Sequence, residues 1–255
     1  MNTMQKQRTA HGVPRWVTLA SLDVPAAASF YRALLGWQTI GDENRLLASR
    51  DGVPVGALLP GAGETPGWLL HLGVPSVTQA IDDVVRAGGS SVTGPEADGT
   101  GAMVAIVTDP AGVRFALRES AAALPLDQKI TPGTLAWGEL ITDDVDASAA
   151  FYAKAFGWEL TDAVGSLSRR EWQVHGGRIA GLLPRPPAMP NEIPPYWDVY
   201  FAVDDIAAAS QTAADHGGTR LMPPTPIEIG TIAVFLDPAG AIFTLVQLGA
   251  EEAAA

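Results

Sequence analysis

Two pairs of side chains in this sequence could act as a general acid and a general base. One pair is Glu139 with Asp198, and the other is His71 with Glu119. The charge on one of two neighbouring carboxyl groups raises the pKa of the other, and a carboxylate raises the pKa of a nearby imidazole. Either shift suits proton transfer near neutral pH. The alternatives are two separate carboxylates at the rim of a concave site, and a lone histidine hydrogen-bonded on a half-buried strand.

Strand periodicity places three of the polar side chains on common faces. In the segments 68–74 and 197–203 every second residue is apolar, and such a face should pack beneath a helix. The opposite face then carries His71 in the first segment, and Asp198 with Tyr200 in the second. We therefore expect these side chains on the concave side of a sheet.

The elements that would position these residues occur twice along the chain. The stretch 16–38 returns at 137–159, with ten of 23 positions identical at an offset of 121 (137 − 16). The turn sequence Asp-Pro-Ala-Gly also recurs, at 109–112 and at 237–240. A long internal copy indicates that one folding unit was duplicated.

The length of 255 residues is sufficient for two domains. We expect them at residues 10–120 and 132–249, joined by a linker at 121–131. Each should contain two βαβββ units, so the expected fold class is α+β, with four such units forming two cup-shaped sheets. A curled sheet leaves its concave face open to water, so such units pair and the resulting cup is the natural ligand site. The units could pair within a domain or exchange across the repeat.

Each cup is expected to combine a large indole ring with a few hydrogen-bonding groups, which is typical of a site for a flat, partly polar molecule. Alternatively, both indole rings fill the cups as core residues. The first cup should carry Trp16, Thr18, His71 and Glu119, and the second should carry Trp137, Glu139, Asp198, Tyr200 and Gln247. Exchange of units across the repeat would redistribute these sets.

Composition excludes several classes of protein. Acidic residues outnumber basic ones by 28 to 16, and the resulting net charge of −12 disfavours nucleic acid, whose phosphates attract a basic surface. No apolar run approaches the roughly 20 residues that span a bilayer, so no membrane segment is expected. The absence of cysteine excludes disulfides and thiolate chemistry, and it fits a cytoplasmic protein.

Several motifs together resemble the vicinal oxygen chelate superfamily, which includes glyoxalase I, bleomycin-resistance proteins, fosfomycin-resistance enzymes and extradiol dioxygenases. They are a helix ending F-Y-x-x-x-x-G-W, a late D-P-x-G hairpin and the βαβββ order, and they cover about residues 12–120 and 133–248. More narrowly, W-x-x-L near the first strand and Y-F-A-V-D-D at 200–205 resemble two-domain bacterial members labelled hydroxylases or glyoxalase-like proteins. Some of those relatives belong to aromatic polyketide antibiotic pathways.

The resemblance also implies where a metal ion would be held: on the first strand, on the strand before the second helix, and at the end of the last strand. These positions hold Trp16, Leu69 and Glu119 in the first half, and Trp137, Asp198 and Gln247 in the second. Indole and alkyl groups cannot ligate a divalent cation, and one or two oxygen donors are too few for a tight site. We therefore expect no resident metal and no other cofactor.

The sequence thus favours metal-independent binding of a small hydrophobic or aromatic molecule in a cup, preferably the second. The resemblance implies tailoring, sequestration or protection in specialised (antibiotic) metabolism. One alternative is a glyoxalase-like lyase or isomerase, or a hydroxylase-like enzyme, that uses Glu139 with Asp198 or His71 with Glu119, with or without a metal. Another is a protein whose cups are packed shut and whose outer surface recruits a partner. A monomer or a homodimer is expected.

Overall fold

The computed structural model describes most of the chain, namely residues 12–42, 44–61, 66–119, 130–165 and 168–249. The first half of the sequence contains β1 (Val13–Ser21), α1 (Val24–Leu35), β2 (Gln38–Asp42), β3 (Arg45–Arg50), β4 (Val53–Pro60), β5 (Gly67–Val74), α2 (Val77–Ala87), β6 (Ser90–Ser91), β7 (Glu96–Ala97), β8 (Met103–Thr108) and β9 (Arg114–Glu119). The second half contains β10 (Leu135–Thr142), α3 (Val145–Phe156), β11 (Glu159–Leu160), β12 (Arg170–Val174), β13 (Gly177–Pro184), β14 (Tyr196–Ala202), α4 (Ile206–Asp215), β15 (Thr219–Ile227), β16 (Gly230–Leu236) and β17 (Ile242–Leu248). Of the expected linker at 121–131, all but the last two residues lie outside the described ranges.

The strands form two sheets, one from each half of the sequence. The first has the order β2-β3-β4-β1-β5-β9-β8-β6, with β7 paired to β8, and the second has the order β11-β12-β13-β10-β14-β17-β16-β15. Within a βαβββ unit the first strand pairs in parallel with the last, as β1 does with β4 and β14 with β17. The expected fold class, α+β with four βαβββ units in two sheets, is confirmed.

The helices begin and end where the local sequence signals stand. Asp23 and Asp144 each accept a hydrogen bond from the backbone N–H three residues on, at 2.9 Å, and so cap α1 and α3. Gly36 and Gly157 end these helices at φ values of 69° and 70°. That left-handed conformation is open to glycine without steric cost, so the repeated F-Y-x-x-x-x-G-W motif fixes the length of both helices.

The chain divides into two compact units, and each draws on both halves of the sequence. The first unit comprises Met1–Pro14, His71–Gln128 and Leu140–Tyr196, and the second comprises Arg15–Leu70, Lys129–Glu139 and Trp197–Ala255. The sequence left open whether βαβββ units pair within a half or across the repeat, and both occur. Strands pair within each half, whereas α1 packs with α4 and α2 packs with α3.

Aromatic side chains build the core of the second compact unit. The ring of Tyr31 on α1 packs against Trp37 and Phe243, with centroids 5.4 and 5.8 Å away, and against Phe201 at 6.4 Å. The Tyr31 hydroxyl donates a hydrogen bond of 3.1 Å to Oδ2 of Asp237, 206 residues along the chain. The F-Y motif of the first βαβββ unit is therefore joined to the D-P-A-G turn of the last.

The first compact unit has an equivalent aromatic core. Phe115 on β9 lies 6.4 Å from Phe151 and 5.7 Å from Tyr152, both on α3. Tyr152 in turn stacks on Trp158 with a centroid separation of 5.0 Å. Because Phe115 belongs to the first half and the other three belong to the second, this core also forms across the repeat.

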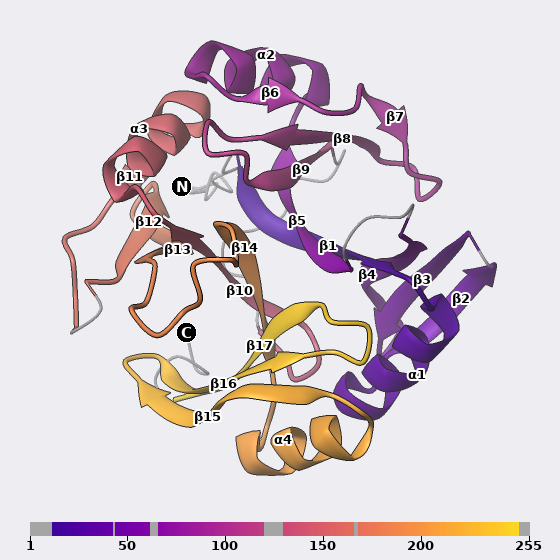
Figure 1. The fold of residues 1–255 in the computed structure, drawn as a ribbon. Coiled ribbons are helices and arrows are strands. Elements are labelled where there is room, and N and C mark those ends of the chain that lie inside the picture. Colours follow the sequence, from indigo (N-terminus) through magenta and orange to yellow (C-terminus); the bar gives the residue numbers. More distant parts are fainter. Residues whose placement is uncertain (1–11, 43, 62–65, 120–129, 166–167, 250–255) are drawn as a thin grey trace, which may run out of the picture. The chain divides into compact units, whose positions relative to one another are not determined.

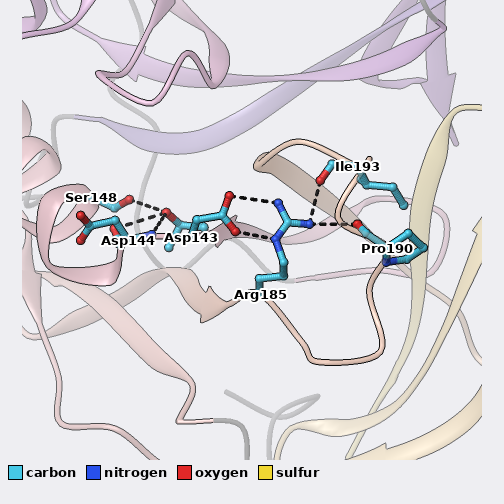
Figure 2. A network of polar contacts seen from close by, with 7 residues as sticks. Asp143, Asp144, Ser148, Arg185, Pro190 and Ile193 are labelled. Carbon is cyan, nitrogen blue, oxygen red and sulfur yellow. Dashed lines mark hydrogen bonds and ion pairs between the residues drawn. The ribbon is translucent and has the colours of Figure 1, made fainter.

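Arg185 fixes the loop that leads from β13 to β14 (Figure 2). Its guanidinium forms an ion pair with Asp143, and Nη1 donates hydrogen bonds to the carbonyl oxygens of Pro190 (3.2 Å) and Ile193 (2.7 Å). Hydrogen bonding to Arg185 lowers the pKa of Asp143 below its ordinary value. The network ties this loop to the end of β10 within the first compact unit.

Candidate functional site

The strands of the last βαβββ unit, β14 to β17, have one face turned towards helices. Phe201 on β14 and Phe243 on β17 lie on it and contact Tyr31 of α1. Figure 1 shows α4 alongside β15, β16 and β17, at the yellow end of the chain. The prediction that the apolar face of 197–203 packs beneath a helix is therefore confirmed.

The opposite face of these strands carries the candidate site, and we call it the inner face. In the parallel β14–β17 pair Tyr200 is in register with Thr244, and in the antiparallel β16–β17 pair Val246 is in register with Ile232. Asp198 lies two residues before Tyr200 and shares its face. The inner face therefore brings together a carboxyl group, a phenol and an alcohol beside aliphatic side chains.

Two short hydrogen bonds organise the polar groups of the inner face. The Tyr200 hydroxyl donates to Oε2 of Glu139 on β10 at 2.6 Å. The Thr244 hydroxyl donates to Oδ2 of Asp198, also at 2.6 Å. Glu139, Asp198 and Tyr200 are only 2, 3 and 4% exposed, and Thr244 is fully buried. All four residues belong to the second compact unit, and the charge of Glu139 acts on the Asp198 carboxyl, so the two pairs form one buried cluster.

The carboxyl group of Asp198 is electrostatically unusual. Burial raises its pKa, the hydrogen bond from Thr244 lowers it, the negative charge of Glu139 raises it and the nearby backbone N–H of Val199 lowers it, so that the pKa moves from 3.8 to about 7. Its Oδ1 atom is buried, and among the residues that the structure describes no group donates a hydrogen bond to it. At neutral pH this carboxyl can therefore be either a proton donor or a proton acceptor.

Apolar side chains surround the phenol end of the cluster. Tyr200 packs with the other buried members of a hydrophobic group, Ile229, Ile232 and Val246. The partly buried side chains packed against this group are Ala136, Trp137, Met222, Ile227 and Leu248. Tyr200 belongs to the polar cluster and to the hydrophobic group, since its hydroxyl donates a hydrogen bond to Glu139 and its ring packs with the apolar side chains. Trp137 therefore lies where the second cup was expected to present an indole ring, and it stays partly exposed.

Gln247 and Glu119 do not lie where the sequence analysis places them. Oε1 of Gln247 accepts the backbone N–H of Ile206 at 3.0 Å, and Oε2 of Glu119 accepts that of Val77 at 2.9 Å. Each side chain therefore satisfies the first N–H of a helix, α4 or α2, where a negative or polar acceptor is favourable. The expectation that both side chains line the cups is wrong.

Strand register also separates His71 from Glu119. In the parallel β5–β9 pair His71 is in register with Ala116, whereas Glu119 is in register with Val74. Since 71 and 74 differ by an odd number, the two side chains project from opposite faces of the sheet. The expected acid–base pair of His71 with Glu119 is therefore not formed.

The four residues expected in the first cup are divided between the compact units. Trp16 and Thr18 lie buried on β1 in the second unit, while His71 and Glu119 lie on β5 and β9 in the first. Four of the five residues expected in the second cup share the inner face or its rim, and Gln247 is the exception.

Thr244 is not among the residues predicted for either cup. Its signal is present, because it is the only hydroxyl residue in the strand IFTLVQL, and an alcohol within an apolar strand needs a hydrogen-bonding partner. Its face could be assigned only from the register with Tyr200, which depends on how β17 pairs with β14.

The donor set does not fit a metal ion. Across the described ranges, no three His, Asp or Glu side chains lie close enough together to hold one. The inner face supplies two carboxyl groups, and each already accepts a hydrogen bond, from Tyr200 or from Thr244. Structural and catalytic zinc sites in proteins use three or more protein ligands, and this face supplies fewer.

Comparison with known proteins identifies the family. The model of the glyoxalase/bleomycin resistance protein/dioxygenase superfamily matches residues 134–245, and that of a glyoxalase-like domain matches residues 16–118. The chain belongs to this superfamily. CFP32 of Mycobacterium tuberculosis (strain CDC 1551 / Oshkosh), which carries a glyoxylase name, is 33% identical over 92% of this chain and 95% of its own length. The anthracycline biosynthesis protein DauV of Streptomyces sp. (strain C5) is 29% identical over 94% of this chain and 95% of its own length.

Solved structures share the fold of this superfamily member at low sequence identity. The Mn(II)-bound glyoxalase from Novosphingobium aromaticivorans has a TM-score of 0.69 at 18% identity, covering 94% of this chain and 83% of its own. The 2,3-dioxygenase LapB from Pseudomonas sp. KL28 also has a TM-score of 0.69, at 15% identity and with 95 and 94% coverage. Among the helices described, none combines the length and the apolar character needed to cross a membrane.

Proposed function

We propose that the inner face of the second sheet binds a small, flat, largely apolar organic molecule without a resident metal ion. The observation that carries this proposal is the buried Oδ1 of Asp198, which has no hydrogen-bond donor among the described residues. A buried polar atom left unsatisfied costs a protein about 1–3 kcal/mol, so such atoms are few in folded proteins, and a bound ligand can supply the missing partner.

The neighbours of Asp198 define what kind of molecule fits. Trp137 is partly exposed and packs against the hydrophobic group that contains Tyr200, so an indole ring lies beside aliphatic side chains. Aromatic platforms next to a few convergent polar groups are typical of sites for flat organic ligands.

The relatives supply a biological setting for this proposal. DauV, and also DnrV of Streptomyces peucetius at 29% identity, are named for anthracycline biosynthesis. These names support our proposal that the present protein acts in specialised, antibiotic-related metabolism. The lack of cysteine supports a cytoplasmic location, because proteins of the reducing cytoplasm rarely depend on disulfides.

The experiment is equilibrium dialysis of the purified protein against 9-fluorenone, a flat tricyclic ketone, with and without EDTA. We expect binding that EDTA leaves unchanged and that Trp137→Phe weakens by about tenfold, because a smaller ring covers less of the ligand. Trp16→Phe, at the equivalent position of the repeat, is the matched control and should leave affinity within twofold. Equal losses in both variants, or a requirement for added metal, would contradict the proposal.

Acid–base catalysis on the bound molecule is a second candidate, favoured by one observation. The pKa of Asp198 near 7 lets this side chain exchange a proton at neutral pH, next to a second carboxyl group, Glu139. Asp198→Asn separates the candidates, since the amide keeps the shape and a hydrogen-bond donor but cannot transfer a proton. If this variant still binds the molecule but no longer converts it, the protein is an enzyme that uses Asp198. If conversion of the bound molecule is unchanged, Asp198 is not the catalytic acid.

A further inference from the structure

We propose that the molecule bound on the inner face presents a carbonyl or similar accepting oxygen, which receives a hydrogen bond from Oδ1 of the neutral carboxylic acid of Asp198. This inference rests on the proposed function and specifies the chemistry of its ligand: a conjugated or aromatic carbonyl compound in preference to a plain hydrocarbon or a cation.

The hydrogen-bonding pattern assigns the proton to one oxygen. Thr244 donates to Oδ2 of Asp198 at 2.6 Å, so Oδ2 serves as the carbonyl oxygen of the acid. Oδ1 is buried and receives no hydrogen bond from any described group. A proton carried on Oδ1 therefore makes this atom a donor without an acceptor, and a ligand oxygen completes the pair.

The surroundings of Asp198 disfavour the charged form. The groups that act on its carboxyl are Thr244, the backbone of Val199 and Glu139, and none of them is a cation. Glu139 acts on Asp198 through its negative charge, and its Oε2 already accepts a hydrogen bond from the Tyr200 hydroxyl. Burial and the nearby negative charge therefore favour the protonated form of the Asp198 carboxyl group.

A buried donor selects strongly among flat ligands of similar size. A molecule without an accepting oxygen leaves the Asp198 hydroxyl unsatisfied after water is excluded, whereas a ketone satisfies it. The hydrophobic group around Tyr200 contacts the rest of the ring system in either case. The difference in affinity between two such ligands therefore measures the hydrogen bond from Oδ1 of Asp198.

The test compares 9-fluorenone with fluorene, which has the same tricyclic shape but no carbonyl, by equilibrium dialysis between pH 6 and pH 8.5. In the wild type we expect fluorenone to bind at least about tenfold more tightly at pH 6. Above pH 7 its affinity should fall by up to about tenfold per pH unit, because each ionised Asp198 loses its donor. The preference for the ketone should shrink accordingly.

Three variants separate donor loss from unfolding. Asp198→Asn keeps a donor at every pH, so fluorenone affinity should persist and become independent of pH. Asp198→Leu has no donor, so it should bind fluorene and fluorenone equally. Asp109→Asn changes a buried carboxyl group of the first compact unit and should leave both affinities within twofold.

The possible outcomes are distinguishable. Equal binding of both compounds by the wild type, without pH dependence, overturns this inference and leaves the proposed function standing. Fluorenone affinity that rises with pH shows that the carboxylate form is engaged, and it overturns the inference as well. Failure to bind either compound overturns the proposed function and the inference with it.

Discussion

Replacing Asp198 by asparagine should make the protein more stable, and increasingly so as the pH rises. The folded pKa of Asp198 is about 7, against an ordinary value of 3.8. Between these values the folded state holds a proton that the unfolded state has lost, so wild-type stability falls from about pH 4 to pH 7 and then levels off. Asparagine keeps the shape and an acceptor for Thr244, and it removes the titration.

The magnitude follows from the difference between the two pKa values. A difference of about three corresponds to roughly 4 kcal/mol in total, at about 1.4 kcal/mol for each pKa unit. The part that falls between pH 5 and pH 8 is about 2.5 kcal/mol. The free energy of unfolding of Asp198→Asn, minus that of the wild type, should therefore grow by about this amount across that range.

The assay is urea unfolding at pH 5, 6, 7 and 8, followed by tryptophan fluorescence and circular dichroism. Subtracting the wild-type curve cancels the titration of the groups that do not interact with Asp198. Asp146→Asn, at an exposed position on α3, controls for the substitution itself. A difference that stays constant from pH 5 to pH 8 would refute the reasoning, since it would mean that burial does not raise the pKa of Asp198.

Three further substitutions test other contacts of the structure. Thr244→Val removes the hydrogen bond that lowers the pKa of Asp198. The free energy of unfolding should drop by about 1–3 kcal/mol. In the same urea series, its decrease with rising pH should continue above pH 7. Tyr31→Phe keeps the aromatic contacts but loses the hydroxyl bonded to Asp237, and urea unfolding should report a loss of about 1.5–3 kcal/mol; a loss below about 0.5 kcal/mol would contradict a role for this bond. Gln247→Ala removes the acceptor for the first N–H of α4, which should cost about 0.5–2 kcal/mol in a thermal melt while fluorenone affinity stays within twofold, and a lost affinity would return this residue to the ligand site.

The second strand of the last βαβββ unit shows what local signals leave open. The segment TRLMPPTPI contains three prolines, which disfavour a strand in the interior of a sheet. It forms β15, which pairs only with β16, at the edge of the second sheet, with two register shifts. Proline is tolerated at such an edge because its missing N–H is not needed by a neighbouring strand. The position of a strand within the sheet is a property of the whole fold.

The sequence by itself determined the duplicated βαβββ scaffold, the helix ends at residues such as Asp23 and Gly36, and the common face of Asp198 and Tyr200. These depend on spacing and on neighbours in the chain. The tertiary structure decided that Gln247 caps a helix and that Tyr31 binds a residue of the opposite half. It also decided that Asp198 is buried beside Glu139, which sets its pKa. Strand register and desolvation depend on which distant segments meet, and no local pattern encodes that.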